Sequence, residues 1–215
     1  MSDQAYVWVS SFRRSSELIL GLETDRTDGS NGSPRTGLPL ARSIWVGEVP
    51  PLHQLPCRIW PGREKPRDLP PLFLVRGFIF VTQEAARILE CGDLGDGSLE
   101  KVAMVASETS DDIERHVFCW VLGNTKSALD LAASRLEHVV TDAPCRPYGF
   151  LPNRPRDGDV RVGEMALWGP DVWYDPALRD GVFLGRKLGD ALEAAGLART
   201  FHIHKAPVQV PLVKV

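Results

Sequence analysis

Proline restricts the first third of this chain more than any other residue type. Eight of its 17 prolines stand between positions 39 and 71. Proline lacks a backbone N–H and fixes one backbone dihedral angle, so prolines at this density exclude regular helix and most sheet pairing. We therefore expect residues 50–71 to run over a surface in extended form. Residues 24–37 offer no apolar anchor, which is typical of a surface loop.

Regular structure is expected mainly from Phe73 onward. Short apolar runs rich in aromatic and β-branched residues favour strands, and apolar residues three or four positions apart favour helices. Strands are expected at 5–10, 17–23, 44–49, 73–81, 99–106, 115–122, 137–140, 161–168, 181–184, 200–206 and 208–215, and helices at 83–90, 124–137 and 186–196. Because these elements do not alternate strictly as β-α-β, they predict an α+β fold with a mixed or antiparallel sheet and short helices.

Two stretches of the chain, 68–105 and 171–208, resemble each other. Each runs from an acidic entry containing proline, through a glycine, into an apolar strand, a short helix, a loop and another strand. Gly77 and Gly181 lie 104 positions apart in this alignment. Either the chain holds two related strand-helix-strand units, or short segments of this kind resemble one another by necessity. For domain organisation we expect an N-terminal part at 1–65, joined compactly to an α+β region at 66–215.

Composition excludes several classes of protein. The chain has 215 residues, 43% of them hydrophobic, with 25 basic and 28 acidic side chains. A net charge of −3 argues against a nucleic-acid binder that works by bulk positive charge. No apolar run is long enough to span a membrane, and the N-terminus lacks the pattern of a signal peptide. We expect a cytoplasmic protein with no membrane and no direct nucleic-acid partner.

No set of residues forms a recognisable catalytic or metal motif. The four cysteines, at positions 57, 91, 119 and 145, include no Cys-x-x-Cys pair, so free thiols are expected. His202 and His204 alternate in a predicted strand and would share one face, but spacing specifies no third metal ligand. Asp171 and Asp175 could act as acid and base, although such carboxylates more often close turns. We expect no cofactor and no metal.

Acidic residues concentrate in one segment. Residues 84–114 contain nine acidic and two basic side chains, a balance of −7. If the flanking turns gather these acids on one side, they form a negative patch that attracts a basic partner. The alternative is an ordinary solvated surface. The candidate partner-binding residues are Asp93, Asp96, Glu100, Glu108, Asp111, Asp112 and Glu114.

The C-terminal stretch 171–203 resembles the closing motif of a bacterial polymorphic-toxin immunity family, immunity family eleven. The middle of the chain is also similar, in RGFIFVTQEAARILE, HVFCWVL and SALDLAASRLE, so the resemblance covers roughly residues 70–205. One departure is Gly185, where such sequences usually have serine. The residues that carry the C-terminal resemblance are Trp173, Asp175, Pro176, Phe183, Leu184, Ala195, Gly196, Leu197 and Phe201.

The resemblance implies a binding function and no catalytic residues. An immunity protein neutralises a cognate toxin, often a nuclease, that a neighbouring cell delivers by contact-dependent or type VI-like secretion. Two alternatives remain open from the residues: an adaptor or chaperone module of a secretion system, and a hydrolase that uses Asp171, Asp175, His202 or His204. A deep pocket joining those four residues would favour the hydrolase.

Overall fold

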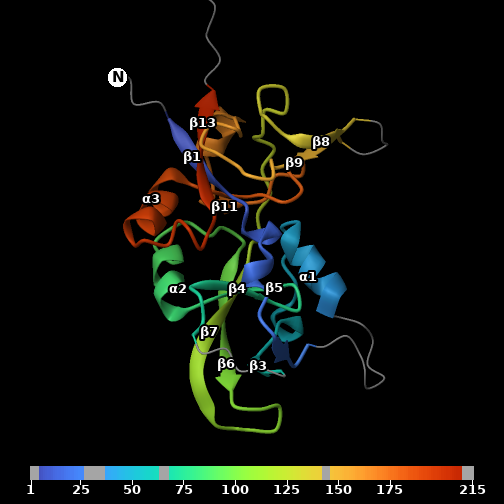
Figure 1. The fold of residues 1–215 in the computed structure, drawn as a ribbon, viewed down its shortest axis with the longest axis vertical. Coiled ribbons are helices and arrows are strands. Elements are labelled where there is room, and N and C mark those ends of the chain that lie inside the picture. Colours follow the sequence, from blue (N-terminus) through green and yellow to red (C-terminus); the bar gives the residue numbers. More distant parts are fainter. Residues whose placement is uncertain (1–4, 27–36, 63–67, 142–145, 210–215) are drawn as a thin grey trace, which may run out of the picture. The chain divides into compact units, whose positions relative to one another are not determined.

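A computed structural model describes residues 5–26, 37–62, 68–141 and 146–209. These residues form three α-helices and thirteen β-strands, which confirms the predicted α+β class with mixed sheets and short helices (Figure 1). The chain divides into two compact units. Unit 1 contains residues 1–14 and 124–215, and unit 2 contains residues 15–123. No helix in the described ranges is both long and apolar enough to cross a membrane.

Unit 2 is built on a six-stranded sheet with strand order β2-β3-β6-β7-β5-β4. Its centre is the long β6–β7 hairpin, and phenylalanines of β4 and β5 fill much of the core. The helices are short, and α2 packs on β5 and β7. The elements are η2 (Ser16–Leu18), β2 (Leu22–Thr24), α1 (Gly37–Trp45), η3 (Leu52–Gln54), β3 (Arg58–Pro61), β4 (Leu72–Val75), β5 (Phe78–Val81), α2 (Gln83–Leu89), β6 (Ser98–Val105) and β7 (Ile113–Val121).

Unit 1 is built on a five-stranded sheet with strand order β10-β13-β1-β12-β11. The N-terminal strand β1 lies at its centre and pairs with β12 on one side and β13 on the other. Helix α3 packs on β1, and a separate hairpin joins β8 to β9. The elements are β1 (Tyr6–Ser10), η1 (Phe12–Arg14), β8 (Glu137–Val140), β9 (Tyr148–Phe150), β10 (Val162–Gly163), η4 (Glu164–Leu167), β11 (Val172–Trp173), β12 (Val182–Leu184), α3 (Arg186–Ala194) and β13 (Ile203–Gln209).

The two sheets share a five-strand arrangement. The order β3-β6-β7-β5-β4 in unit 2 corresponds to β10-β13-β1-β12-β11 in unit 1. In each, the first pair is parallel and the other three are antiparallel. In each, a helix follows the fourth strand of this order and packs on the central one. The resemblance between 68–105 and 171–208 therefore reflects two units with related architecture.

The correspondence extends to register and to individual contacts. In unit 2 Phe118 faces both Val81 and Lys101, and in unit 1 Trp8 faces both Leu184 and Lys205. Lys101 and Lys205 are 104 positions apart, the spacing found in the sequence alignment.

Each unit also stacks an aromatic pair across its hairpin, Phe73 on Phe80 in unit 2 and Trp173 on Phe183 in unit 1. The residue before each helix donates its N–H to the residue before the hairpin: Thr82 to Pro71, and Gly185 to Asp171. Chance similarity of short segments does not account for agreement at this level, so the duplication interpretation is favoured.

Four expected elements are wrong in whole or in large part. Residues 17–23 were expected as a strand, but Ser16–Leu18 form the 3₁₀ turn η2 and strand β2 begins only at Leu22. Residues 44–49 were expected as a strand, but Ile44 and Trp45 end helix α1 and a turn follows. Residues 124–137 contain no helix, because their N–H groups bond to other segments: that of Asp130 to the carbonyl of Arg161, and that of Arg135 to Asp159. In 161–168 only Val162 and Gly163 are strand, and Glu164–Leu167 form the 3₁₀ turn η4. The proline-rich 50–71 does include one paired strand, β3.

The boundaries of the two units fall away from the expected domain boundary. Residues 65 and 66 both lie within unit 2 and outside the described residues. The structure divides the chain instead after Arg14 and after Gly123. The reason is that β1 is sequestered in the sheet of unit 1, so the N-terminal residues do not form a part of their own with the proline-rich segment.

Candidate protein-binding surface

The β6–β7 hairpin carries four of the candidate acidic residues at its tip. Glu108, Asp111, Asp112 and Glu114 are all exposed, and the side chain of Asp111 is 99% exposed. The hairpin that holds them is paired along the whole of β6. Local sequence explains the tip, because the polar run SETSDD favours a turn between two apolar strands. These carboxylates are thus presented to solvent at the end of a well-paired ribbon.

Arg58 of β3 anchors this tip. Its Nη2 donates to the carbonyl of Ser110 and lies 3.7 Å from a carboxylate oxygen of Asp111. The hydroxyl of Ser110 in turn accepts the backbone N–H of Asp112 at 3.1 Å. An ion pair this exposed contributes little stability, but the bond to the carbonyl limits how far the turn can move. The acidic tip is consequently held in position by Arg58, and the charge of Asp111 is partly neutralised.

The remaining acidic candidates do not join the tip. Asp93 and Asp96 lie in the turn before β6, where a carboxylate oxygen of Asp93 accepts the N–H of Gly95 at 2.9 Å. The eight residues of β6 separate this turn from the tip by about 27 Å. Glu100 lies between them, half-buried and opposite Cys119. The structure therefore divides the predicted patch into two groups.

Glu114 also borders a polar hollow on unit 2. The hollow has a volume of about 500 Å³ and is lined by Glu84 of α2 and by Glu114, Arg115 and His116 of β7, among others. It brings together two carboxylates that are 30 positions apart in the sequence. Sequence patterning does not reveal this neighbourhood, because it depends on how α2 packs on β7.

Asp175, a candidate catalytic residue, is a structural carboxylate. Its side chain is buried and accepts three backbone N–H groups, from Ala128 and Leu129 at 2.7 Å and from Ala177 at 2.9 Å. These bonds compensate the cost of burying the charge and tie the segment after β7 to the segment after β11. Both carboxylate oxygens of Asp175 are thus engaged by the backbone, which assigns this side chain a structural role.

Asp171 explains the glycine at position 185. The backbone N–H of Gly185 donates to the carbonyl of Asp171 at 2.6 Å, and a Cβ on Gly185 would collide with the Asp171 carboxylate. Serine, the residue usual in the resembling family, therefore needs Asp171 to move. Helix α3 begins at Arg186 without a side-chain cap.

His202 and His204 do not share a strand face. His202 has a φ of +48°, a left-handed conformation, and precedes β13, so strand alternation does not relate it to His204. Burial lowers the pKa of His204, Asp157 and Asp159 oppose that shift, and His202 adds to it. Within the described ranges, no group of three His, Cys, Asp or Glu side chains is arranged to hold a metal ion.

The cysteines are free thiols where the structure describes them. Cys57 and Cys91 are exposed, and Cys119 is buried in the sheet of unit 2, where burial raises its pKa. Cys145 lies outside the described residues. A buried thiol with a raised pKa is protonated and unreactive at neutral pH.

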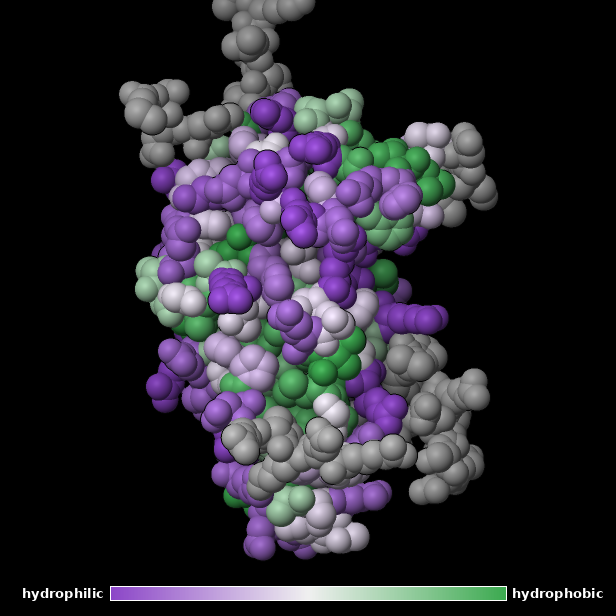
Figure 2. All heavy atoms as spheres, in the orientation of Figure 1, coloured by the Kyte–Doolittle hydropathy of each residue, from purple (hydrophilic) through white to green (hydrophobic). Residues whose placement is uncertain are grey.

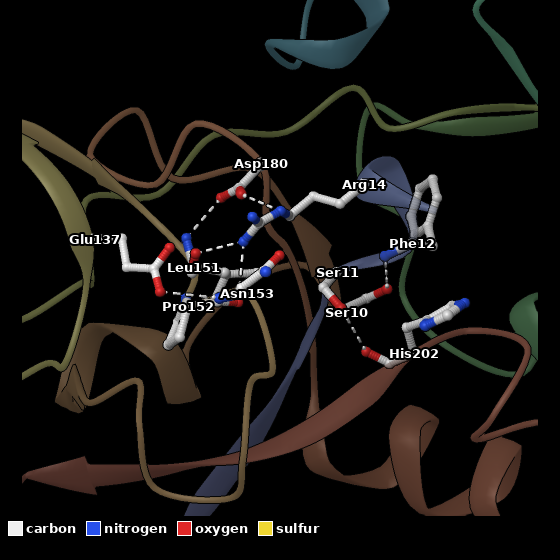
Figure 3. Close-up of polar contacts among 10 residues, drawn as sticks. All are labelled: Ser10, Ser11, Phe12, Arg14, Glu137, Leu151, Pro152, Asn153, Asp180 and His202. Atoms are coloured by element: carbon white, nitrogen blue, oxygen red, sulfur yellow. Dashed lines mark hydrogen bonds and ion pairs between the residues drawn. The ribbon is translucent and has the colours of Figure 1, made fainter. Parts of the chain in front are cut away.

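An Arg14–Asp180 network, which the sequence did not indicate, braces unit 1 (Figure 3). The guanidinium of Arg14 lies 3.3 Å from the Asp180 carboxylate and donates to the carbonyls of Leu151 and Pro152. The other carboxylate oxygen accepts the N–H of Leu151 at 2.9 Å. Burial raises the pKa of Asp180, although Arg14 and the Leu151 N–H oppose the shift. Because every contact ends on backbone or on the partner charge, the network holds loops together.

Unit 1 exposes a run of large apolar side chains. Met165, Leu167 and Trp168 lie on and just after η4, and Trp168 is 68% exposed. Tryptophan and methionine are enriched where proteins bind one another. The exposure of Trp168 could not be predicted from the sequence, because residues 161–168 also fit the pattern of a strand.

No protein-family model matches the chain, and no curated protein sequence matches it.

Proposed function

We propose that this chain is an immunity protein that binds a cognate bacterial toxin domain in the cytoplasm and blocks it, without catalysis of its own. The observation that carries the proposal is the β6–β7 hairpin tip, where Glu108, Asp111, Asp112 and Glu114 are exposed on a well-paired ribbon. The family resemblance stated from the sequence adds the toxin as the partner. Asp175, the buried carboxylate of the hydrolase alternative, is occupied by backbone N–H groups.

The chemistry of the tip suits a basic partner. Exposed carboxylates grouped on one projection raise the rate at which a positively charged surface associates, and salt reduces that advantage. A nuclease toxin needs cationic side chains to hold the phosphates of its substrate. An acidic projection that occupies this surface would exclude the nucleic acid. Tight inhibition further requires roughly 1,200–2,000 Å² of buried surface and a few apolar anchors, for which Trp168 is a candidate.

The test is co-expression with the toxin-like product of the adjacent gene, scoring survival and co-purification. We expect rescue and a stable complex with the wild-type chain. Glu108→Lys with Asp112→Lys should slow association at least about tenfold at low salt and little at high salt, because the tip acts by steering. The matched control, Asp93→Lys with Asp96→Lys, makes the same change of charge at the other end of β6.

Three results would contradict the proposal or its charge argument. Absence of both rescue and binding would remove the toxin as partner. Binding to a component of a secretion machine without rescue would favour the adaptor alternative. Equal loss of association rate in the tip variant and the control variant would show that overall charge acts, and not the hairpin tip.

A further inference from the structure

A cleft of about 450 Å³ opens on unit 2. Its wall is mostly apolar and includes Ile19, Trp45 at the end of α1, and Leu74 of β4. Gly21 also lines the cleft, and a Cβ there would meet open space. In Figure 2 hydrophobic residues gather just below the middle of the face, in the area where β4 and β5 are labelled in Figure 1. The volume is in the range of sites that hold ligands or inserted side chains.

An ion pair borders the cleft. Arg76 donates from Nε and Nη2 to the two carboxylate oxygens of Glu23, at 2.8 and 2.7 Å. Arg76 and Gly77 form the two-residue turn between β4 and β5, with φ values of +50° and +87°. Such turns favour Asn-Gly, and arginine in the left-handed region is strained. A strained arginine whose side chain borders a cleft suggests a role for that side chain beyond the turn.

The corresponding place in unit 1 provides an internal comparison. There Thr125 forms a parallel bridge with Tyr174, just after β11, as Ile19 does with Leu74 at the edge strand β4. Both bridging residues are exposed, but one is threonine and the other is an isoleucine that is 62% exposed. Related architecture tolerates a polar residue at this point. In unit 2 this residue is the apolar Ile19, which lines an apolar cleft, as expected if the cleft binds an apolar group.

We propose that this cleft receives an apolar side chain from a peptide segment of the partner protein, and that Arg76 donates a hydrogen bond to a backbone carbonyl of that segment. The proposal rests on the protein-binding function proposed above and names the chemistry of one contact. It concerns unit 2 alone and does not depend on the acidic hairpin tip.

The charges and hydrogen-bond donors of Glu23 and Arg76 favour a peptide over a charged small molecule as the ligand of the cleft. Glu23 and Arg76 neutralise each other, so among the described residues that line the cleft an added carboxylate or ammonium would find no net opposite charge. The bonds to Glu23 use Nε and Nη2, whereas Nη1 carries two further N–H donors suited to a neutral acceptor. A peptide supplies an apolar side chain and a neutral carbonyl a few ångströms apart.

The test titrates the full-length chain, labelled with fluorotryptophan, with N-acetyl-leucinamide. The fluorine resonance of Trp45, assigned with Trp45→Phe, should move on addition of this probe. N-acetyl-glycinamide, which lacks the side chain, should leave it in place, and N-acetyl-leucine, which adds a carboxylate, should bind more weakly. Gly21→Leu should weaken binding of the amide about tenfold, which corresponds to about 1.4 kcal/mol. Leu52→Ala, an exposed residue that does not line the cleft, is the control.

Arg76→Asn separates binding from stability. Asparagine relaxes the turn, so the midpoint of thermal unfolding should stay level or rise while the affinity for the amide falls. An unmoved Trp45 resonance, or a Gly21→Leu variant that binds like the wild type, would overturn the proposal. If the amide binds in the cleft but no toxin is neutralised, the cleft stands as a peptide site and the toxin assignment fails. If toxin is neutralised equally by wild type and Gly21→Leu, the cleft proposal fails alone.

Discussion

At the scale of single residues, two carboxylates of unit 1, the buried Asp175 and the half-buried Asp180, hold the backbone in place. Asp175 accepts N–H groups from two chain segments, and Asp180 accepts one from Leu151 while it pairs with Arg14. A buried carboxylate without such donors would cost several kcal/mol, so these residues are confined to the places where backbone N–H groups converge. In the sequence, acidic residues close to aromatic residues are compatible with a catalytic role. Their hydrogen-bond partners in the structure indicate a structural role instead.

His204 makes stability depend on pH. Burial lowers its pKa in the folded protein below the ordinary 6.5. When pH falls below 6.5, the unfolded chain takes up a proton that folded His204 does not, so the free energy of unfolding should decrease between pH 6.5 and the folded-state pKa. His204→Gln should reduce this slope, measured by urea unfolding at several pH values. Exposed His53→Gln should keep it, and an unchanged slope in His204→Gln would contradict the assignment.

At the scale of elements, helix α3 depends on a glycine to approach its sheet. A Cβ on Gly189 would collide with the indole ring of Trp8, which is buried on β1. The neighbouring Asp190 accepts hydrogen bonds from Tyr6 and from the Trp8 indole, both at 2.9 Å. Because Gly189 has no side chain, α3 can lie close to β1. The hydrogen bonds of Asp190 to Tyr6 and Trp8 fix the position of α3 along β1.

Gly189→Ala should destabilise the protein although alanine is the better helix former. Propensity favours the substitution by about 1 kcal/mol, but a methyl group against a ring that cannot move costs about 1–3 kcal/mol. We expect a net loss in the free energy of unfolding, measured by denaturant titration. Exposed Ala194→Ser in the same helix should change stability by less than about 0.5 kcal/mol. Stabilisation by Gly189→Ala would show that α3 can shift on β1.

At the scale of the whole molecule, the chain order of the two units differs by one strand. In unit 2 the central strand β7 follows β6 directly, whereas in unit 1 the central strand β1 comes from the N-terminus. Residues 15–123 are thus inserted between β1 and the rest of unit 1. This arrangement would result from a tandem duplication in which β1, at the N-terminal end, takes the place in unit 1 that β7 has in unit 2.

A circular permutant tests this arrangement. If Val215 is joined to Met1 and the chain opened between Arg14 and Ser15, β1 follows β13, as β7 follows β6. Because Tyr6 pairs with Pro207, the two strands are already placed for such a hairpin. We expect the permutant to fold, with the circular dichroism spectrum and cooperative thermal unfolding of the wild type. Deletion of residues 1–14 removes the central strand and should unfold unit 1; a permutant that fails to fold would contradict the hairpin equivalence.

The sequence by itself determined the elements whose signals are local. Apolar runs bounded by turn residues specified β1, β6, β7 and β12, helical spacing specified α2 and α3, and the spacing of 104 residues indicated the two related units. Each of these strands and helices depends on neighbours within about ten positions, so composition and period are sufficient to predict it. The acidic residues were equally visible, because charge does not depend on the fold.

Only the tertiary structure decided what depends on distant partners. Residues 124–137 have helical spacing, yet the N–H groups of Ala128 and Leu129 bond to Asp175, and that of Asp130 bonds to the carbonyl of Arg161. Strand register placed the acids in two groups, and packing of α1 and β4 made the cleft beside Ile19. A backbone hydrogen bond can be satisfied by many partners at similar free energy, so the choice between local and distant partners is made by the whole fold.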